Sequence, residues 1–306
     1  MKDIILIAGP TASGKSALAH ALAEKLSGTV INADSMQVYR ELRILSARPA
    51  ESEMGNVPYR LYGHVPGAEA YSAARFAVEA SAAIDAARVE GRVPIVVGGT
   101  GLYFKALIEG LSPIPPVPED IRTRWRKAAE DQTPRALHAE LAGRDPAMAA
   151  RLRPTDPQRI VRALEVLEAT GVSLARWQET PGEPVLRSSE THAFVVSPPR
   201  EELRERIDTR FDAMMRDGAV DEVQSLRALG LDPDLPVMRA LGVRPLMEFL
   251  EGATSREAAA ETAKAETRQY AKRQVTWLRS NMSAWKWLST QQMKSMDRLI
   301  VDFIKS

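Results

Sequence analysis

The sequence contains no cysteine and only four histidines. Without cysteine, disulfides, zinc–thiolate sites and cysteine nucleophiles are excluded. The histidines are scattered with no spacing typical of metal ligands, so we expect them on the surface or on helix faces. The sequence also lacks, near its N-terminus, an apolar stretch long enough for a signal peptide or a membrane span. We therefore expect a cytoplasmic protein that does not contact a membrane.

A strong excess of charge of either sign is also absent, because 41 basic residues face 40 acidic ones and leave a net charge of +1. The total charge therefore gives no argument for a nucleic-acid partner, and any basic surface must come from local clusters. The rest of the composition is that of an ordinary globular protein, with 44% hydrophobic and 26% charged residues over 306 positions. A chain of this length can bury a sizeable core and form more than one domain.

Short apolar runs alternate with helical patterns in the first third of the chain. The runs typical of strands are residues 4–8, 29–33 and 94–97. The longest helical pattern between them covers residues 71–90. This alternation is typical of an α/β fold in which helices cover a parallel sheet. Asp34 and Gly98 would then lie just past the C-terminal ends of their strands, at the edge where such sheets bind ligands.

The most informative motif is the segment between the first strand and the first helix. It reads Gly-Pro-Thr-Ala-Ser-Gly-Lys-Ser, which is the G-x-x-x-x-G-K-S/T pattern of a P-loop. In such a loop the backbone N–H groups and the helix N-terminus face a phosphate, Lys15 adds a point charge, and the Ser16 hydroxyl can reach Mg²⁺. The expected diphosphate- or nucleotide-binding residues are Gly9, Pro10, Thr11, Ala12, Ser13, Gly14, Lys15 and Ser16. The sequence thus predicts a P-loop NTPase-like core, but the loop alone does not say whether the phosphate is transferred, hydrolysed or expelled.

Two further segments follow predicted strands. Residues 34–39 place a carboxylate, a hydroxyl and an amide directly after one strand, so Asp34 either orients a metal or accepts a proton, or merely caps the next helix. Residues 98–103 carry three glycines around Thr100. These glycines allow a backbone to approach a ligand closely, or they serve tight packing alone. No aspartate ends this strand, which argues against an ordinary NTP-hydrolysing engine.

The middle of the chain has a different character. Residues 111–118 contain four prolines and can continue neither a helix nor a central strand, so we place a domain boundary there. Residues 119–178 look helical throughout, with breaks at Gly143 and Pro154. A strand at residues 193–196 then returns to the first sheet. We therefore expect an α/β core of residues 1–115 and 193–306, interrupted by an inserted all-helical domain of residues 116–192.

The remainder of the core reads as helical over residues 199–230 and again over residues 255–279. Residues 293–306 contain an apolar run that fits either a closing strand or a helix. The sequence does not decide between these two interpretations.

Two later segments gather basic side chains. Gln158, Arg159 and Arg162 stand at the start of a helix capped by Asp156 and begun by Pro157. They face either a polyanion or solvent. Near the end of the core, three basic residues surround an aromatic one, a mixture that binds phosphates and stacks on bases. These are Lys272, Arg273, Trp277 and Arg279, although Trp277 is equally compatible with core packing.

Taken together, these motifs resemble one family, the tRNA dimethylallyltransferases, also called tRNA isopentenyltransferases. The resemblance runs nearly from end to end, in order and at the expected spacings. The matching segments are residues 9–16, 34–40, 98–103, 156–165, 206–211 and 272–277.

The family transfers a five-carbon prenyl group from dimethylallyl diphosphate to N6 of the adenosine at position 37 of tRNAs that read codons beginning with U. The resemblance implies that the P-loop holds the leaving diphosphate, with Lys15, the loop amides and Mg²⁺ bound partly by Ser16 stabilising its charge. It implies that Asp34 accepts or orients the N6 proton. It also implies that Thr100 forms a hydrogen bond near the departing oxygen and that Arg210 clamps the phosphate.

The resemblance further implies that the anticodon stem-loop of tRNA is the partner. The adenosine must leave its stack to react, and the unstacked loop is then held by phosphate and base-edge contacts. No obligate protein partner is expected, and a monomer suffices. The residues expected to bind tRNA are Asp34, Ser35, Met36, Gln37, Arg122, Gln158, Arg159, Ile160, Val161, Arg162, Arg239, Gly242, Arg244, Lys272, Arg273, Gln274, Thr276, Trp277 and Arg279.

The chain departs from the family pattern in three places. Residues 44–49 read Ile-Leu-Ser-Ala-Arg-Pro where Ile-Gly-Thr-Ala-Lys-Pro is common, which keeps a hydroxyl and a cation. Residues 59–63 lack the usual carboxylate, so no role is assigned to them. Residues 241–244 read Leu-Gly-Val-Arg. Arg244 is there the expected phosphate contact, because Val243 cannot stack as an aromatic would.

Two other functions fit parts of the pattern. A P-loop small-molecule kinase would bind ATP and use Asp34 to receive a hydroxyl proton, but it gives no role to the arginine-bearing insert. A nucleotide-dependent RNA-binding module would bind tRNA without any chemistry.

Overall fold

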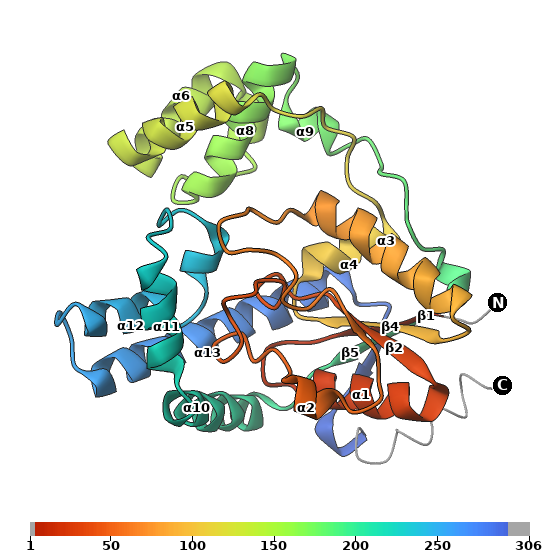
Figure 1. Cartoon of the computed structure of the whole chain (residues 1–306). Coiled ribbons are helices and arrows are strands. Elements are labelled where there is room, and N and C mark those ends of the chain that lie inside the picture. The colour runs from red at the N-terminus through yellow and green to blue at the C-terminus, as the bar shows by residue number, and fades with distance from the viewer. Residues whose placement is uncertain (1–3, 293–306) are drawn as a thin grey trace. The chain divides into compact units, whose positions relative to one another are not determined.

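The computed structural model describes residues 4–292, so the undecided segment 293–306 lies outside the described residues. The chain divides into two compact units. The core unit consists of Met1–Ile108 and Val185–Ser306, and the helical unit of Glu109–Pro184 (Figure 1). No helix in the described part of the chain is both long and apolar enough to cross a membrane.

A six-stranded parallel sheet lies at the centre of the core unit, with strand order β3-β2-β4-β1-β5-β6. Three of its four inner strands are wholly buried, because helices cover both faces of a parallel sheet, and the fourth, β5, is buried over its second half. Two short edge strands, β3 and β6, are absent from the sequence-based expectation. The strands are β1 Ile4–Ala8, β2 Gly28–Asn32, β3 Tyr59–Arg60, β4 Val93–Gly98, β5 Thr191–Val196 and β6 Lys286–Leu288.

The two faces of the sheet bury different side chains. Ile5 and Ile7 of β1 pack with the helix that follows the P-loop, whereas Ile4 and Leu6 pack with the helices of the opposite face. The alternation follows from the two-residue period of a strand. The helices of the core unit are α1 Lys15–Leu26, α2 Glu51–Met54, α3 Ala73–Val89, α4 Gly101–Ile108, α10 Arg200–Arg216, α11 Ala219–Ala228, α12 Val243–Leu250 and α13 Arg256–Asn281, with 3-10 turns η1 Ser188–Glu190 and η2 Pro236–Arg239.

Local signals explain where these helices begin and end. Ser72 and Ser255 cap α3 and α13, each accepting a hydrogen bond of 3.1 Å from the amide three residues later. The predicted helix over residues 199–230 is two helices, because Gly218 between them has a φ of 103°. That left-handed conformation ends one helix and starts the next at little cost only for glycine.

The helical unit has its own apolar core, which includes Trp125, Leu137 and Leu164. The predicted break at Gly143 comes one residue early, since α6 ends at Arg144 and the following residue, Asp145, caps the next helix. The helices of this unit are α5 Glu119–Asp131, α6 Pro134–Arg144, α7 Pro146–Ala149, α8 Pro157–Thr170 and α9 Leu174–Trp177.

The chain leaves and re-enters the core unit at different residues from those expected. The predicted boundary between residues 192 and 193 falls inside β5, because Thr191 and His192 already pair with Ile4 and Ile5. The predicted boundary at 115 also comes late, since the core unit ends with α4 at Ile108. A proline-rich sequence indicates a stiff, extended segment. It does not locate the end of a packed unit, which depends on the contacts between its residues.

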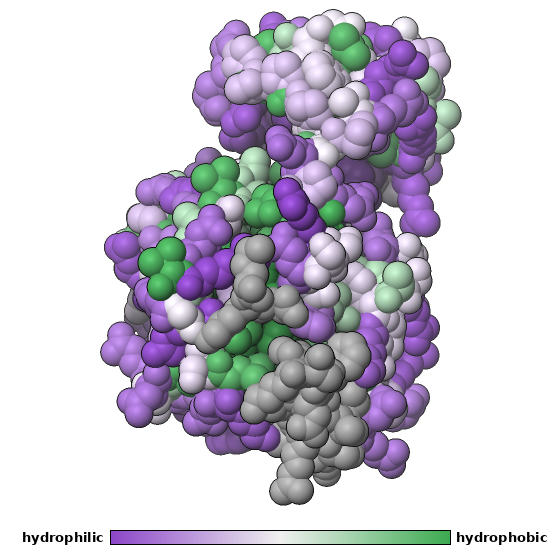
Figure 2. Space-filling view, turned by 90° about the vertical axis from the view of Figure 1, so that its right-hand side faces the viewer, coloured by the Kyte–Doolittle hydropathy of each residue, from purple (hydrophilic) through white to green (hydrophobic). Residues whose placement is uncertain are grey.

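The face shown in Figure 2 is mainly hydrophilic, with apolar patches between polar residues. The exposed large apolar residues in the described part lie on several helices and loops, as single residues often do on soluble domains. They are Val78, Val89, Leu102, Val172 and Leu229.

Candidate active site

The P-loop connects β1 to α1 and is shaped by two residues with positive φ, Ala12 at 61° and Gly14 at 90°. The Lys15 ammonium donates a hydrogen bond of 3.2 Å to the carbonyl of Pro10 across the loop. The hydroxyl of Ser13 is buried and has no hydrogen-bond partner among the described residues. An unpaired hydroxyl in a closed loop of amides is what an anion with several oxygens would satisfy.

The charge of Lys15 is weakened by its surroundings. Loss of hydration lowers its pKa from 10.5 to about 8, the carboxylate of Asp34 acts in the opposite direction, and Arg210 adds to the lowering. Lys15 is therefore still largely protonated at pH 7. A bound phosphate would restore the missing counter-charge.

Helix α10 brings two arginines to the P-loop. Arg210 donates to the hydroxyl of Thr11 over 3.2 Å, although the two residues are 199 positions apart. Arg206 donates to the carbonyl of Ser13 over 3.4 Å. Burial lowers the pKa of Arg210 and Asp34 opposes this effect, yet a guanidinium remains protonated at any working pH. Three cations thus surround the loop that the sequence predicts to bind diphosphate.

Asp34 stands two residues after β2, in a turn held by its neighbours. Asn32 accepts a hydrogen bond of 2.9 Å from the Asp34 amide, and Asp34 Oδ1 accepts one of 2.9 Å from the Met36 amide. No helix follows, so the interpretation of Asp34 as a helix cap is wrong. The carboxylate instead supports a turn with one oxygen and lies close enough to Lys15 and Arg210 to affect the pKa of both.

Thr100 begins the turn after β4, beside Asp34. Its hydroxyl accepts from the Ser35 amide over 2.9 Å and lies 3.2 Å from the Ser35 hydroxyl. Its own amide donates to the carbonyl of Ala33. The ends of β2 and β4 are therefore joined directly, and Thr100 orders the segment that carries Asp34.

A second connection joins this turn to the P-loop. Gln274 of α13 accepts a hydrogen bond of 2.9 Å from the Thr11 amide and donates one of 2.9 Å to the carbonyl of Gly99. The side chain is buried, so the expectation that it contacts tRNA needs correction. Its amide fits because it supplies one acceptor and one donor in a single planar group. The sequence gives no signal for this role, since the partners lie 263 and 175 positions away.

Two of the three glycines around Thr100, Gly99 and Gly101, pack closely against α13, whereas Gly98 packs against the backbone of Ala33. A Cβ added at Gly99 would lie 2.4 Å from the Gln274 amide nitrogen, and one added at Gly101 would lie 2.1 Å from the Trp277 ring. Neither space admits a side chain. Trp277 therefore combines core packing with a position beside the candidate site. The structure shows that these glycines pack closely, and their approach to a ligand stays a prediction.

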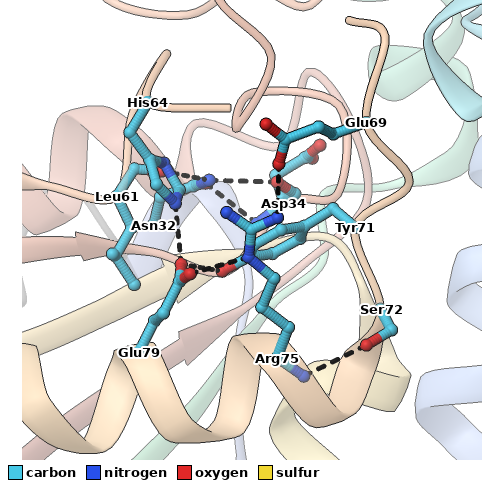
Figure 3. Close-up of polar contacts among 9 residues, drawn as sticks. All are labelled: Asn32, Asp34, Leu61, His64, Glu69, Tyr71, Ser72, Arg75 and Glu79. Atoms are coloured by element: carbon cyan, nitrogen blue, oxygen red, sulfur yellow. Dashed lines mark hydrogen bonds and ion pairs between the residues drawn. The ribbon is translucent and has the colours of Figure 1, made fainter. Parts of the chain in front are cut away.

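A polar network centred on Glu79 joins α3 to the segment that precedes it. Figure 3 shows the Glu79 carboxylate at the meeting point of His64, Tyr71 and Arg75. Burial by itself would raise the pKa of Glu79, but hydrogen bonds from Tyr71, Arg75 and His64 outweigh it and lower that pKa. The network holds residues 61–72 against α3. None of these residues stands in a motif, so only the fold shows that they act together.

Comparison with known proteins identifies the family. The family model described as IPP transferase matches residues 37–281, and the model described as Isopentenyl transferase matches residues 2–63. The chain is 53% identical to the tRNA dimethylallyltransferase of Parvibaculum lavamentivorans, covering 98% of this chain and 95% of the relative. The chain belongs to the tRNA dimethylallyltransferase family. A second relative with this name, from Azorhizobium caulinodans, is 55% identical over 92% of this chain and 90% of its own length.

Solved structures of the family have the same fold. The tRNA isopentenylpyrophosphate transferase of Bacillus halodurans is 32% identical with a TM-score of 0.70, covering 100% of this chain and 97% of its own. A eukaryotic dimethylallyltransferase, whose structures are described as snapshots of its action on tRNA, is 30% identical with a TM-score of 0.79, covering 100% of this chain and 80% of its own.

Several of the residues expected to bind tRNA lie on α13 and near α12. On α13, four of them are exposed: Lys272, Arg273, Thr276 and Arg279. The guanidinium of Arg273 lies 5.7 Å from the centre of the Tyr270 ring. Near α12, Arg239 is paired with Asp234 and Arg244 with Glu248 and Glu266. Exposed ion pairs of this kind contribute little to stability, so the arginines can leave their carboxylate partners and pair with phosphates instead.

Some expected contacts are not available as side chains. Gly242 is buried with a φ of 87° at the start of α12, and this left-handed backbone conformation favours glycine. Ile160 and Val161 belong to the core of the helical unit, because a helix that exposes Arg159 on one face turns its next residues inward.

The other expected residues of the helical unit reach solvent. Gln158 and Arg159 are exposed, while Arg162 and Arg122 are partly so. Arg159 donates to Asp156 over 2.6 Å, and Asp156 also caps α8 as predicted. The three residues that follow Asp34 are partly buried; they are Ser35, Met36 and Gln37. Gln37 donates to two carbonyls of the chain itself.

Proposed function

We propose that this protein transfers a dimethylallyl group from dimethylallyl diphosphate to N6 of the adenosine at position 37 of tRNAs that read codons beginning with U, and releases diphosphate. The observation that carries the proposal is that the carboxylate of Asp34 lies close to Lys15 and Arg210, two cations that contact the P-loop, while Arg206 contacts the same loop and is paired with Glu202. Cations suit a departing diphosphate, and a carboxylate suits an amine that loses a proton. The family to which the chain belongs supports the same conclusion.

In this reaction the N6 nitrogen forms a bond to the allylic carbon, and the bond from that carbon to the diphosphate oxygen breaks. The electron pair of the broken bond leaves with the diphosphate, whose growing charge is stabilised by Lys15, Arg210 and the loop amides. Asp34 accepts the proton that N6 loses. Thr100 keeps the Asp34 segment in place through Ser35.

The residues present fit a magnesium ion shared with the diphosphate. The described residues contain no cluster of three or more acidic, histidine or cysteine side chains. Magnesium bound to phosphates needs few protein ligands, and the Ser16 hydroxyl is exposed on the first turn of α1. When bound there, the ion would neutralise charge on the leaving diphosphate.

The test is to incubate the protein with labelled dimethylallyl diphosphate, Mg²⁺ and an unmodified tRNA that has adenosines at positions 36 and 37. Digestion should yield prenylated adenosine from position 37, and a tRNA with guanosine at 37 is the control. Absence of product would contradict the proposal. ATP consumption with a small acceptor would indicate a kinase, and tRNA binding without product would indicate a binding module.

A further inference from the structure

Residues 40–49, called here the 40–49 loop, contain no helix or strand and yet are closely held. The amides of Arg43, Ile44 and Leu45 all donate to one carboxylate, that of Glu222 in the first turn of α11. The three hydrogen bonds measure 2.7, 2.7 and 2.9 Å. Successive N–H groups that converge in this way form an anion-binding concavity. Here the chain supplies the anion itself, and the helix N-terminus favours its charge.

The opposite side of the 40–49 loop is held by Gln37. Its amide nitrogen donates to the carbonyls of Ser46 and Ala47 over 2.9 and 3.0 Å. Ala47 has a φ of 50°, a left-handed conformation that costs energy for alanine. Such a backbone persists only when its surroundings fix it. Glu222 binds the N–H groups of this loop and Gln37 binds its C=O groups.

The side chain that this arrangement fixes is Leu45. It is buried and lines a small pocket whose polar lining residues are Thr11 of the P-loop, Arg210 and Thr267. One of its methyl groups would lie 2.9 Å from a Cβ at Gly242, so Leu45 has no room to move toward α12. The other apolar residues of the pocket are Ala12, Ile207, Phe211, Met214 and Leu241.

The position of this pocket matches the shape of an allylic diphosphate. The hydrocarbon of such a molecule begins one C–O bond from the phosphate, so its binding site must adjoin the P-loop. A pocket that adjoins the P-loop, with one cation and two hydroxyls in a lining that is otherwise apolar, meets both requirements. The apolar wall formed by Leu45 then limits how many carbons fit.

We propose that Leu45 determines the length of the prenyl group that the enzyme accepts, and that Glu222 is the positioning residue that holds Leu45 in place. This inference rests on the proposed function. Glu222 lies on α11 and contacts the 40–49 loop rather than substrate, and it acts through the backbone of residues 43–45.

The decisive variant is Glu222→Gln, which keeps the size of the side chain but turns one acceptor oxygen into a donor that faces backbone N–H groups. The matched control is Asp221→Asn, because Asp221 is exposed and carries the same charge on the same helical turn. Leu45→Ala enlarges the pocket directly. Each variant is assayed with unmodified tRNA and either dimethylallyl diphosphate or the ten-carbon geranyl diphosphate.

We expect Glu222→Gln to raise KM for dimethylallyl diphosphate about tenfold with kcat changed less than about threefold, because it loosens a wall of the binding pocket and leaves the reacting groups intact. Both Glu222→Gln and Leu45→Ala should raise the ratio of kcat/KM for geranyl over dimethylallyl diphosphate by about tenfold or more. Asp221→Asn should behave as the unsubstituted protein. KM for tRNA should be unchanged in all variants.

An unchanged substrate ratio in Leu45→Ala overturns the inference, even if Glu222→Gln fails to fold. A Glu222→Gln protein that loses activity equally toward both diphosphates and tRNA, with a lower Tm, shows a merely structural role and also overturns it. A separate result tests the proposed function, since it fails if the unsubstituted protein transfers no prenyl group to tRNA.

Discussion

At the scale of single residues, the candidate site depends on charges whose strength is set by their neighbours. Loss of hydration in the P-loop lowers the pKa of Lys15, and the negative charge of Asp34 offsets only part of this lowering. Asp34 is shared in turn between a local turn and the two nearby cations. An anionic leaving group bound at the P-loop would add counter-charge for Lys15 and Arg210, which Asp34 supplies only in part.

The first prediction concerns Asp34. Asp34→Asn should lower the rate of prenyl transfer in a single turnover by a factor on the order of 10²–10⁴, because an amide cannot accept the N6 proton. The affinity for tRNA should change less than about twofold, since the variant keeps the size of the side chain and its acceptor for the Met36 amide. Rapid-quench kinetics and filter binding give the two quantities. A fall in affinity alone would identify Asp34 as a binding residue.

The second prediction concerns pH. The Lys15 pKa of about 8 lies below its ordinary value, so the protonated form that attracts diphosphate is present below about pH 8 and is lost above it. Affinity for inorganic diphosphate should therefore fall about tenfold between pH 7 and pH 9 through this group. Calorimetry across this range measures the effect. Lys15→Met provides the reference, because diphosphate titrates as well and only the difference between the two proteins reports on Lys15.

At the scale of elements, helices from distant parts of the sequence complete the P-loop. The strand, loop and first helix form a local unit, whereas α10 contributes Arg206 and Arg210 and α13 contributes Gln274. Both helices follow the inserted unit in sequence. A P-loop is thus easily recognised in the sequence, but the side chains that tune it come from more than 180 positions later.

The third prediction concerns the connection made by Gln274. Gln274→Leu should leave the Thr11 amide and the Gly99 carbonyl without their partner and lower the free energy of unfolding by about 1–3 kcal/mol. Affinity for diphosphate should fall as well, because the P-loop loses one of its supports. Denaturant unfolding and calorimetry measure the two effects. Gln224→Leu, at an exposed position of α11, should change neither quantity.

The same scale shows what periodicity predicts well. Helices α3, α8 and α13 begin where Ser72, Asp156 and Ser255 cap them, because a cap acts within three residues. The two-residue strand β3 and the strand β6 were not foreseen. Their positions at the sheet edges depend on pairing with β2 and β5, and so short a run carries no periodic signal.

At the scale of the whole molecule, the residues expected to react with the diphosphate and some of those expected to bind tRNA lie in different units. The core unit carries the P-loop and Asp34, and the helical unit presents Gln158 and Arg159 to solvent. The helical unit has an apolar core of its own. Its surface can therefore change with little effect on the chemistry of the core unit.

The fourth prediction tests this division. Arg159→Ala should weaken tRNA binding and reduce the slope of log K against log salt by about one, since one phosphate contact releases about one counterion. Affinity for dimethylallyl diphosphate should not change. Filter binding at several salt concentrations measures the slope. Arg60→Ala removes an arginine of the core unit that is also exposed and paired with a carboxylate, and an equal loss there would show that the effect reflects total charge.

The sequence by itself determined the parallel α/β core, the P-loop and its strand and helix, the position of Asp34 after a strand, and the presence of a helical insert. All of these depend on spacing and on contacts within a few residues. The tertiary structure alone decided that Gln274 is buried and connects two loops by hydrogen bonds, and that Ile160 and Val161 pack inward. It also decided that Glu222 accepts hydrogen bonds from the 40–49 loop. The physical reason is that a polar side chain acquires its role from its hydrogen-bond partner. When that partner lies some 180–260 positions away, only folding brings the two together.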